Sequence, residues 1–304
     1  MNLYETYEQF IDKTYNLFAV IILTIFRLNF TMRLHQQLLN ARKLKFSLAL
    51  ILFTATTFNL KAQTCTKAFH IVVLGSSTAY GDGASIGHSW VALYTSYLKK
   101  INKNYVVDNI AVPGTTTYSA QPDNYVPPKG RPAPLIGHNI TTAIQLNADA
   151  IIINFPTNDA ASDFTLTEQQ NNFKRITTIA KNHNILVWVA TTQPRDNFSA
   201  QQVSSQKKLF TWIQSFYKGH SIDFQNGLAS GKDSILFKYN AGDGIHLNDA
   251  GHKVLYQRVV AKSIPDSLCN SVNKVMFFDQ KKIDSIHSDL IKTEKKFQPY
   301  AAQE

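Results

Sequence analysis

Between residues 68 and 262, short apolar runs alternate with longer segments in which apolar residues recur at helical spacing. Residues 68–74 and 150–154 are almost wholly apolar, which is typical of strands buried on both faces of a sheet. Residues 167–183 favour a long helix, with Thr167 as its N-cap. The expected strands are residues 68–74, 105–110, 150–154, 185–190 and 221–224, and the expected helices are residues 89–99, 141–146, 167–183, 204–217 and 249–262.

Strands that alternate with helices predict an α/β fold, in which one parallel sheet lies between two layers of helices. In such a sheet, sites lie beyond the carboxyl ends of the strands, near the point where the strand order reverses. Gly-Ser-Ser-Thr at residues 75–78 and Pro-Thr-Asn-Asp at residues 156–159 each follow an expected strand. The sequence therefore predicts that these two polar motifs share one edge of the sheet.

The first 62 residues differ in character from the rest of the chain. A basic stretch at 33–45 precedes an apolar run at 46–58, which is too short for a typical membrane span and resembles the hydrophobic region of a signal peptide. We therefore interpret residues 32–62 as a signal peptide and residues 1–31 as a mis-called extension or a further hydrophobic segment. The alternative is an N-terminal membrane anchor. A cleaved signal predicts a secreted or periplasmic protein without stable membrane association.

The remaining chain is interpreted as one domain, residues 63–270, followed by a charged C-terminal tail, residues 271–304. Cys65 and Cys269 are the two cysteines, one near each end of this domain. In an oxidising compartment they could form a disulfide that ties the ends together, and the alternative is a pair of free thiols.

The composition indicates a globular protein and argues against a nucleic-acid-binding one. Hydrophobic residues make up 44% and charged residues 17%, which is ordinary for a globular domain. Residues 1–62 contribute +4 of the net charge of +10, and the remaining +6 is spread along the chain. Nucleic-acid binding would require clustered Lys and Arg with aromatic residues between them, so no nucleic-acid partner is expected. Neither a metal-binding motif nor a nucleotide-binding loop is found, and no cofactor is expected.

Three residues could supply acyl-transfer chemistry. Ser77 lies in the turn after the first strand, where its hydroxyl could act as a nucleophile. Asp243 and His246 are three residues apart, so the carboxylate could orient the imidazole as a base for Ser77. Each motif alone is weak, because a turn serine or a turn Asp-x-x-His would look the same. Ala79 in place of glycine disfavours the nucleophile elbow of α/β-hydrolases.

An oxyanion hole could complete this set. Asn158 offers a side-chain amide, and Gly114 a backbone N–H that a ligand can approach closely. Together with the backbone N–H of Ser77, these groups could stabilise a tetrahedral intermediate. Taken singly, both residues could instead be ordinary turn residues.

The order Ser77, Gly114, Asn158, His246 resembles the SGNH/GDSL hydrolase superfamily. The matching blocks lie at residues 74–78, 109–114, 156–159 and 243–248, and the resemblance spans residues 69 to about 262. It implies a flavodoxin-like three-layer α/β/α sandwich with a five-stranded parallel sheet, and ester hydrolysis without a cofactor. It also implies that Ser77 is the nucleophile, His246 the base and Asp243 its orienter, with Ser77, Gly114 and Asn158 as oxyanion donors.

Two positions depart from the pattern of the superfamily. Ser76 stands where an aspartate usually precedes the nucleophile, and Pro156 stands where a glycine usually begins the third block. Neither residue belongs to the triad, so we expect activity to survive. The chain looks most like secreted Bacteroidetes-type hydrolases that resemble acetylesterases or lysophospholipases.

The substrate is expected to be a small-molecule or carbohydrate ester, handled by a monomer. Tyr80, Trp90, Tyr118 and Arg195 lie in or near loops that could line the cleft. Aromatic rings suit sugars, and the chain lacks a long apolar lid, which favours short acyl groups such as acetyl. Alternatives are a lysophospholipase or thioesterase of the same superfamily, a non-catalytic carbohydrate-binding relative, and a flavodoxin-like module.

Overall fold

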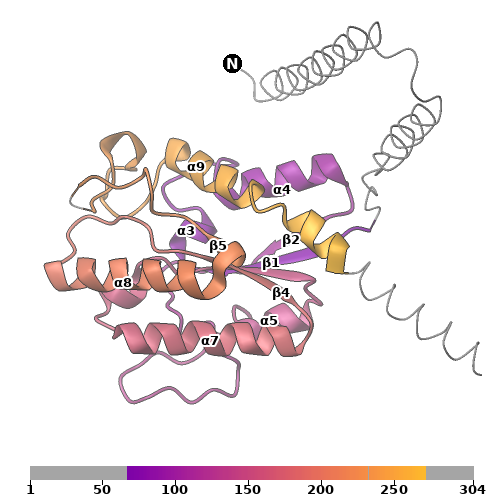
Figure 1. Ribbon diagram of the computed structural model, residues 1–304, viewed down its shortest axis with the longest axis horizontal. Coiled ribbons are helices and arrows are strands. Elements are labelled where there is room, and N and C mark those ends of the chain that lie inside the picture. Colours follow the sequence, from indigo (N-terminus) through magenta and orange to yellow (C-terminus); the bar gives the residue numbers. More distant parts are fainter. Residues whose placement is uncertain (1–66, 232, 272–304) are drawn as a thin grey trace, which may run out of the picture. The chain divides into compact units, whose positions relative to one another are not determined.

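A computed structural model describes residues 67–231 and 233–271, all of which belong to one compact unit. Its centre is a five-stranded parallel sheet with the strand order β2-β1-β3-β4-β5 (Figure 1). The strands are β1 (His70–Gly75), β2 (Val106–Asn109), β3 (Ala150–Asn154), β4 (Leu186–Ala190) and β5 (Ser221–Ile222). The predicted α/β fold with a five-stranded parallel sheet is confirmed.

The strand order places the two polar motifs beside each other. β1 pairs with β2 on one side and with β3 on the other, so the direction of strand progression reverses between β1 and β3. The register of β1 and β3 sets Gly75 opposite Asn154 at their carboxyl ends. The loops that follow these strands therefore start from one point of the sheet edge, where α/β proteins usually bind ligands.

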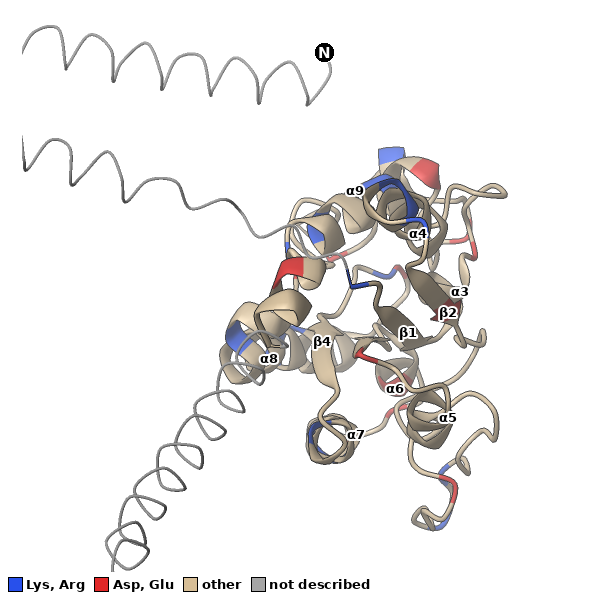
Figure 2. Cartoon of the chain, turned by 90° about the vertical axis from the view of Figure 1, so that its right-hand side faces the viewer, with Lys and Arg blue, Asp and Glu red and all other residues tan. Residues whose placement is uncertain are grey.

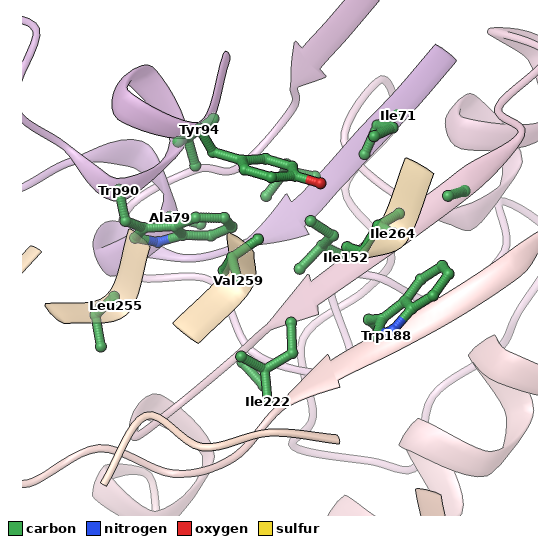
Figure 3. Close-up of a cluster of buried hydrophobic side chains, with 14 of the residues drawn as sticks. Ile71, Ala79, Trp90, Tyr94, Ile152, Trp188, Ile222, Leu255, Val259 and Ile264 are labelled. Carbon is green, nitrogen blue, oxygen red and sulfur yellow. The ribbon is translucent and has the colours of Figure 1, made fainter. Parts of the chain in front are cut away.

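Two helix layers cover the sheet. α4 (Trp90–Ile101) and α9 (Asp249–Val260) lie on one face, and their buried side chains pack against the strands with those of the segment after β5 (Figures 1 and 3). α5 (Ile140–Gln145), α7 (Leu166–Asn182) and α8 (Ala200–Tyr217) contribute to the core on the other face. The three-layer architecture follows from alternate strand residues pointing to opposite faces.

Two short helices were missed by the sequence prediction. α3 (Ser77–Tyr80) directly follows β1, and α6 (Asn158–Ala161) directly follows β3. Each is a single turn, too short to show a helical period in the sequence. Both begin at a residue of the predicted site.

Several helix boundaries also differ from prediction. Thr165, not Thr167, is the N-cap of α7, and the predicted cap was wrong. The Thr165 hydroxyl accepts from the backbone N–H of Glu168, whose carboxylate accepts from the backbone N–H of Thr165. This reciprocal pair satisfies two donors at the start of the helix. α8 begins at Ala200, four residues before the expected start at residue 204, because Ser199 and Gln202 form the same motif.

Charge is distributed over several elements. Lys and Arg occur on α4, α8 and α9, and of these three helices α9 also carries an acid, Asp249, at its start (Figure 2). The described residues contain no helix of the length and apolar character that a membrane span requires.

The predicted signal peptide, the upstream extension and all but the first residue of the predicted tail lie outside the described residues. Cys65 also lies outside them, so its pairing with Cys269 stays a prediction. Cys269 itself is buried, with 8% exposure, and it is not a free thiol.

Candidate active site

Ser77 is held in a tight turn at the end of β1. The backbone N–H of Ser76 donates to the carbonyl of Asn154 at 3.1 Å, which ties the ends of β1 and β3 together. The Ser77 carbonyl accepts from the N–H groups of Gly81 and Asp82 at 2.8 and 3.0 Å. Ser77 is only 8% exposed, and its hydroxyl has no hydrogen-bond partner among the described residues. The backbone is therefore fixed while the hydroxyl stays uncommitted.

Gly75 makes this turn possible. A Cβ atom at this position would lie 2.6 Å from Cβ of Ala79 and 2.8 Å from the carbonyl oxygen of Asn154. Both distances are shorter than van der Waals contact, so only glycine lets α3 pack this closely on the end of β3.

Gly114 lies in a loop held between the ends of β1 and β3. The backbone N–H of Val112 and the hydroxyl of Thr115 each donate to the Gly75 carbonyl at 3.1 Å. Asn158, the first residue of α6, donates its side-chain amide to the Thr115 carbonyl at 2.9 Å. Gly114 has a φ of +78°, a conformation that favours glycine. The loop thus holds Gly114 next to Thr115, the residue whose carbonyl Asn158 binds.

The sequence analysis assigned no role to Asp159, yet this residue holds the same loop through Thr117. This carboxylate is 2% exposed and accepts from both the backbone N–H and the hydroxyl of Thr117. The Thr117 hydroxyl in turn accepts from the Asn172 amide at 3.0 Å. Burial raises the pKa of Asp159 from its usual 3.8 to about 6, although the hydrogen bonds from Thr117 oppose this rise. A buried acid therefore supports the loop that carries Gly114.

Asp243 fixes the imidazole of His246. The Nδ1 atom of His246 lies 2.6 Å from Oδ2 of Asp243, and Oδ1 accepts from the backbone N–H groups of Ile245 and His246 at 2.8 Å each. Partial burial raises the pKa of Asp243, but these hydrogen bonds outweigh it and lower the pKa to about 2. The carboxylate therefore stays ionised at neutral pH, and Nε2 of the ring makes no hydrogen bond to the described residues.

The free side of the imidazole faces the segment that follows α3. Nε2 of His246 lies 3.9 Å from Oδ2 of Asp82, whose backbone N–H binds the Ser77 carbonyl. A Cβ on Gly83 would lie 2.8 Å from Cβ of His246. The structure thus brings the His246 loop against the Ser77 turn, although no hydrogen bond joins the Ser77 hydroxyl to the imidazole. Catalytic hydrogen bonds are often long before substrate binds.

Gln193 connects the same two segments, and sequence reasoning missed it. Its Oε1 accepts from the hydroxyl of Thr78 at 3.0 Å, and its Nε2 donates to the carbonyl of Ile245 at 3.2 Å. The residue follows β4 and is 2% exposed. A glutamine after a strand carries no sequence signal for this role, because its two partners lie far from it along the chain.

The four predicted substrate contacts differ in how exposed they are. Tyr80 is 59% exposed at the end of α3. Trp90 is fully buried and packs against Phe224 in the core, so its predicted place in the cleft is wrong (Figure 3). Tyr118 is also buried, at 2% exposure, and its hydroxyl donates to Glu168 at 2.9 Å, so it does not line an open cleft either.

Arg195 is the predicted substrate contact that lies beside the segment carrying Asn158. It is half-buried, and Nη1 lies 3.5 Å from the hydroxyl of Thr157, the residue before Asn158. Burial lowers the pKa of its guanidinium. Its guanidinium favours polar or anionic groups beside the segment that carries Asn158. No group of three or more His, Cys, Asp or Glu among residues 67–231 and 233–271 could hold a metal ion.

Residues 73–254 match the model of the GDSL-like lipase/acylhydrolase family. The chain belongs to this family. The family comprises carboxylic ester hydrolases, and this chain is accordingly one of them. The match covers all four blocks, from the Ser77 turn to the His246 loop. A search of curated proteins finds no match for this GDSL-family chain.

The chain is similar to several solved structures at low sequence identity. A lipolytic protein of the G-D-S-L family from Desulfitobacterium hafniense is 16% identical, with a TM-score of 0.50 over 64% of this chain and 99% of that one. The esterase EstA from Pseudoalteromonas sp. is 16% identical, with a TM-score of 0.48 over 64% and 95%. An acylhydrolase from Bacteroides fragilis is 19% identical, with a TM-score of 0.48 over 69% and 97%.

Proposed function

We propose that this GDSL-family hydrolase is a secreted serine esterase that hydrolyses short-chain acyl esters, including O-acetyl groups on carbohydrates. Ser77, His246 and Asp243 act as the triad. The observation that carries the proposal is the imidazole of His246, which Asp243 fixes through Nδ1 at 2.6 Å, while Nε2 lies 3.9 Å from Asp82, whose backbone N–H binds the Ser77 carbonyl. A carboxylate on Nδ1 is the support that a histidine base for a serine requires.

The reaction proceeds in two steps. The Ser77 oxygen attacks the acyl carbon while His246 Nε2 takes the hydroxyl proton. The tetrahedral intermediate collapses, the bond to the alcohol oxygen breaks, and His246 returns the proton to that alcohol. Water then attacks the acyl-enzyme with His246 again as base, which releases the acid and restores Ser77. Asp243 stays ionised throughout and stabilises the imidazolium.

Three donors serve the oxyanion. The backbone N–H groups of Ser77 and Gly114 make no backbone hydrogen bond in the described part of the chain, and neither has a side-chain acceptor there. Asn158 uses one side-chain N–H for the Thr115 carbonyl and keeps the other. Each donor of this kind typically lowers the barrier by about 3 kcal/mol. Pro156 lacks an N–H, but the donor of that block is Asn158, so this departure leaves the site intact.

Two adjacent serines provide a sharp experiment. Ser77→Ala removes the nucleophile, whereas Ser76→Ala changes a neighbour whose side chain makes no hydrogen bond to the described residues. We expect 4-nitrophenyl acetate hydrolysis to fall at least about 1,000-fold in Ser77→Ala and to persist in Ser76→Ala. His246→Ala should match Ser77→Ala. Equal loss in both serine variants, or activity retained in Ser77→Ala, would overturn the assignment.

Acyl-chain length tests the substrate class. Rates with 4-nitrophenyl acetate, butyrate and octanoate should fall with chain length if the protein is a short-chain esterase. A rise towards octanoate would instead indicate a lysophospholipase or thioesterase. Export is tested separately, by expressing the chain with and without residues 32–62 and measuring the protein in the periplasm and medium.

A further inference from the structure

Arg195 lies in a segment that is attached to the loop of the proposed triad. Gln193, two residues before it, donates its side-chain amide to the Ile245 carbonyl at 3.2 Å. The backbone N–H of Asp196, the next residue, donates to the Gly244 carbonyl at 2.7 Å. These two carbonyls belong to the residues that separate the proposed acid from the proposed base. The chain on both sides of Arg195 is therefore fixed to the loop that carries them.

The side chain of Arg195 also reaches the segment that carries an oxyanion donor. Its Nη1 lies 3.5 Å from the hydroxyl of Thr157, and Asn158 is the next residue. The guanidinium is therefore beside both the triad loop and the start of α6. A cation in this place is close to the groups that contact the reacting ester in the proposed mechanism.

No ion pair neutralises Arg195 within the described part of the chain. The carboxylate of the adjacent Asp196 accepts from the backbone N–H of Ile235 and from the Asn240 amide instead. Of the five N–H donors of the guanidinium, only one has an acceptor among the described residues. Burial lowers the pKa of the guanidinium, and the charge of Asp243 offsets only part of this effect. A partly buried cation with uncommitted donors favours an anionic partner.

The space beside Arg195 is large enough for a small molecule. Arg195 lines a cavity of about 340 Å³ beyond the carboxyl ends of β4 and β5. Among the described residues, the charged side chains that line it are Arg195, Lys207 and Asp233. Lys207 and Asp233 form an ion pair at 2.7 Å, so the charge of Arg195 is the one left uncompensated. The Phe198 ring, also in the wall, lies 5.2 Å from the guanidinium carbon.

We propose that Arg195 selects esters whose alcohol part carries a carboxylate, which accepts hydrogen bonds from the guanidinium in this cavity. The proposal rests on the proposed esterase function. Because the proposed acyl group is short, a charged group of the substrate belongs to the alcohol part. The planar fork of an arginine donates two parallel hydrogen bonds to a carboxylate, and a neutral ester of the same shape cannot form this pair. A fatty chain in the cavity would leave the cation without a partner.

The test compares two acetate esters that differ in charge. 4-Acetoxybenzoate and 4-acetoxybenzamide share the acyl group and nearly the same shape, but only the first carries a carboxylate. We expect Arg195→Gln to lower kcat/KM for the benzoate about tenfold relative to the benzamide. Arg195→Lys keeps the charge but not the fork, so it should lower this ratio by a smaller factor. It carries the test if Arg195→Gln does not fold.

Arg175→Gln is the matched control. Arg175 is also partly buried and forms no ion pair with the described residues, but it lies on α7 and outside the cavity. The variant removes the same charge from the protein at another place. We expect it to leave the ratio of the two esters unchanged. An equal fall in Arg175→Gln and Arg195→Gln would show a general effect of net charge and would overturn the proposal.

A binding measurement separates this proposal from the proposed function. Titration of 4-acetoxybenzoate into the Ser77→Ala protein reports on the cavity without turnover. Weaker binding in Ser77→Ala/Arg195→Gln than in Ser77→Ala supports the role of Arg195 even if the wild-type protein hydrolyses neither ester, which would refute only the esterase function. A ratio that neither Arg195 variant changes, or benzoate binding that is absent or independent of Arg195, would overturn the proposal.

Discussion

Asp159→Asn should change how the stability of the protein depends on pH. Burial raises the pKa of Asp159 to about 6 in the folded state, from its usual 3.8 in an unfolded chain. The folded state therefore holds this proton more tightly. Between these two values the folded protein loses stability as pH rises, and above pH 6 the loss is complete. The asparagine variant keeps an acceptor for Thr117 but does not titrate.

The size of the effect follows from the two pKa values. Each pKa unit corresponds to about 1.4 kcal/mol, so the rise from 3.8 to about 6 is worth about 3 kcal/mol over the full pH range. At pH 4.5, where the folded carboxyl is still mostly protonated, about 1 kcal/mol of this difference is developed, and about 2 kcal/mol develops between pH 4.5 and 7.5. We expect the free energy of unfolding of the variant, relative to wild type, to be about 2 kcal/mol more favourable at pH 7.5 than at pH 4.5.

Urea denaturation of both proteins at the two pH values measures this difference. Because the comparison is made between variant and wild type, acids elsewhere in the chain, such as Asp243 with its lowered pKa, cancel. Asp163→Asn is a matched control, since Asp163 is exposed and its positive φ suits asparagine. A relative stability of Asp159→Asn that is the same at both pH values would refute the account of Asp159 as a buried, titrating anchor.

Three further changes have defined outcomes. Gln193→Leu removes the hydrogen bonds to the buried Thr78 hydroxyl and to the partly buried Ile245 carbonyl. We expect kcat for 4-nitrophenyl acetate to fall by about 10- to 100-fold with little change in KM; an unchanged kcat would contradict the positioning role of Gln193. Gly75→Ala forces a Cβ to within 2.6 Å of Ala79, and should lower the free energy of unfolding by about 1–3 kcal/mol; a variant of wild-type stability in denaturant would show that the turn can relax. Glu168→Gln removes the ion pair with Arg131 and part of the α7 cap. Arg131 is the main cause that lowers the pKa of Glu168 to about 2. In wild type the stabilisation from the ionised Glu168 is therefore lost as pH falls from about 4.5 to 2. The thermal melts of the variant should therefore differ from those of wild type at pH 7 and converge towards pH 2, and a constant difference would disagree with this reasoning.

Local patterns in the sequence account for much of the fold. Residues 150–154 form β3 with the predicted bounds, because a run of apolar side chains can be satisfied only as a strand buried on both faces. The alternation of strands and helices then predicts the parallel sheet. The start of α7 was predicted two residues too late, at Thr167. Glu168 stands three residues after Thr165, and this spacing makes Thr165 the N-cap.

The sequence by itself also predicted which residues of the proposed site belong together. Ser77, Gly114, Asn158 and His246 lie in four blocks whose order resembles the SGNH/GDSL pattern. The carboxyl ends of parallel strands meet at one edge, which brings the Ser77 and Asn158 blocks together. Asp243 and His246 are close in sequence, so their contact at 2.6 Å is a local property of one loop.

Only the tertiary structure decided what supports and surrounds these residues. Gln193 binds Thr78, which lies 115 residues before it, and Ile245, which lies 52 residues after it. Asp159 binds Thr117, which lies 42 residues before it. Trp90 lies in the core and not in the cleft, because α4 packs that face inward against the sheet. Periodicity assigns a side chain to one face of its own element, but its partners depend on the strand order and on the direction in which each neighbouring element presents its side chains.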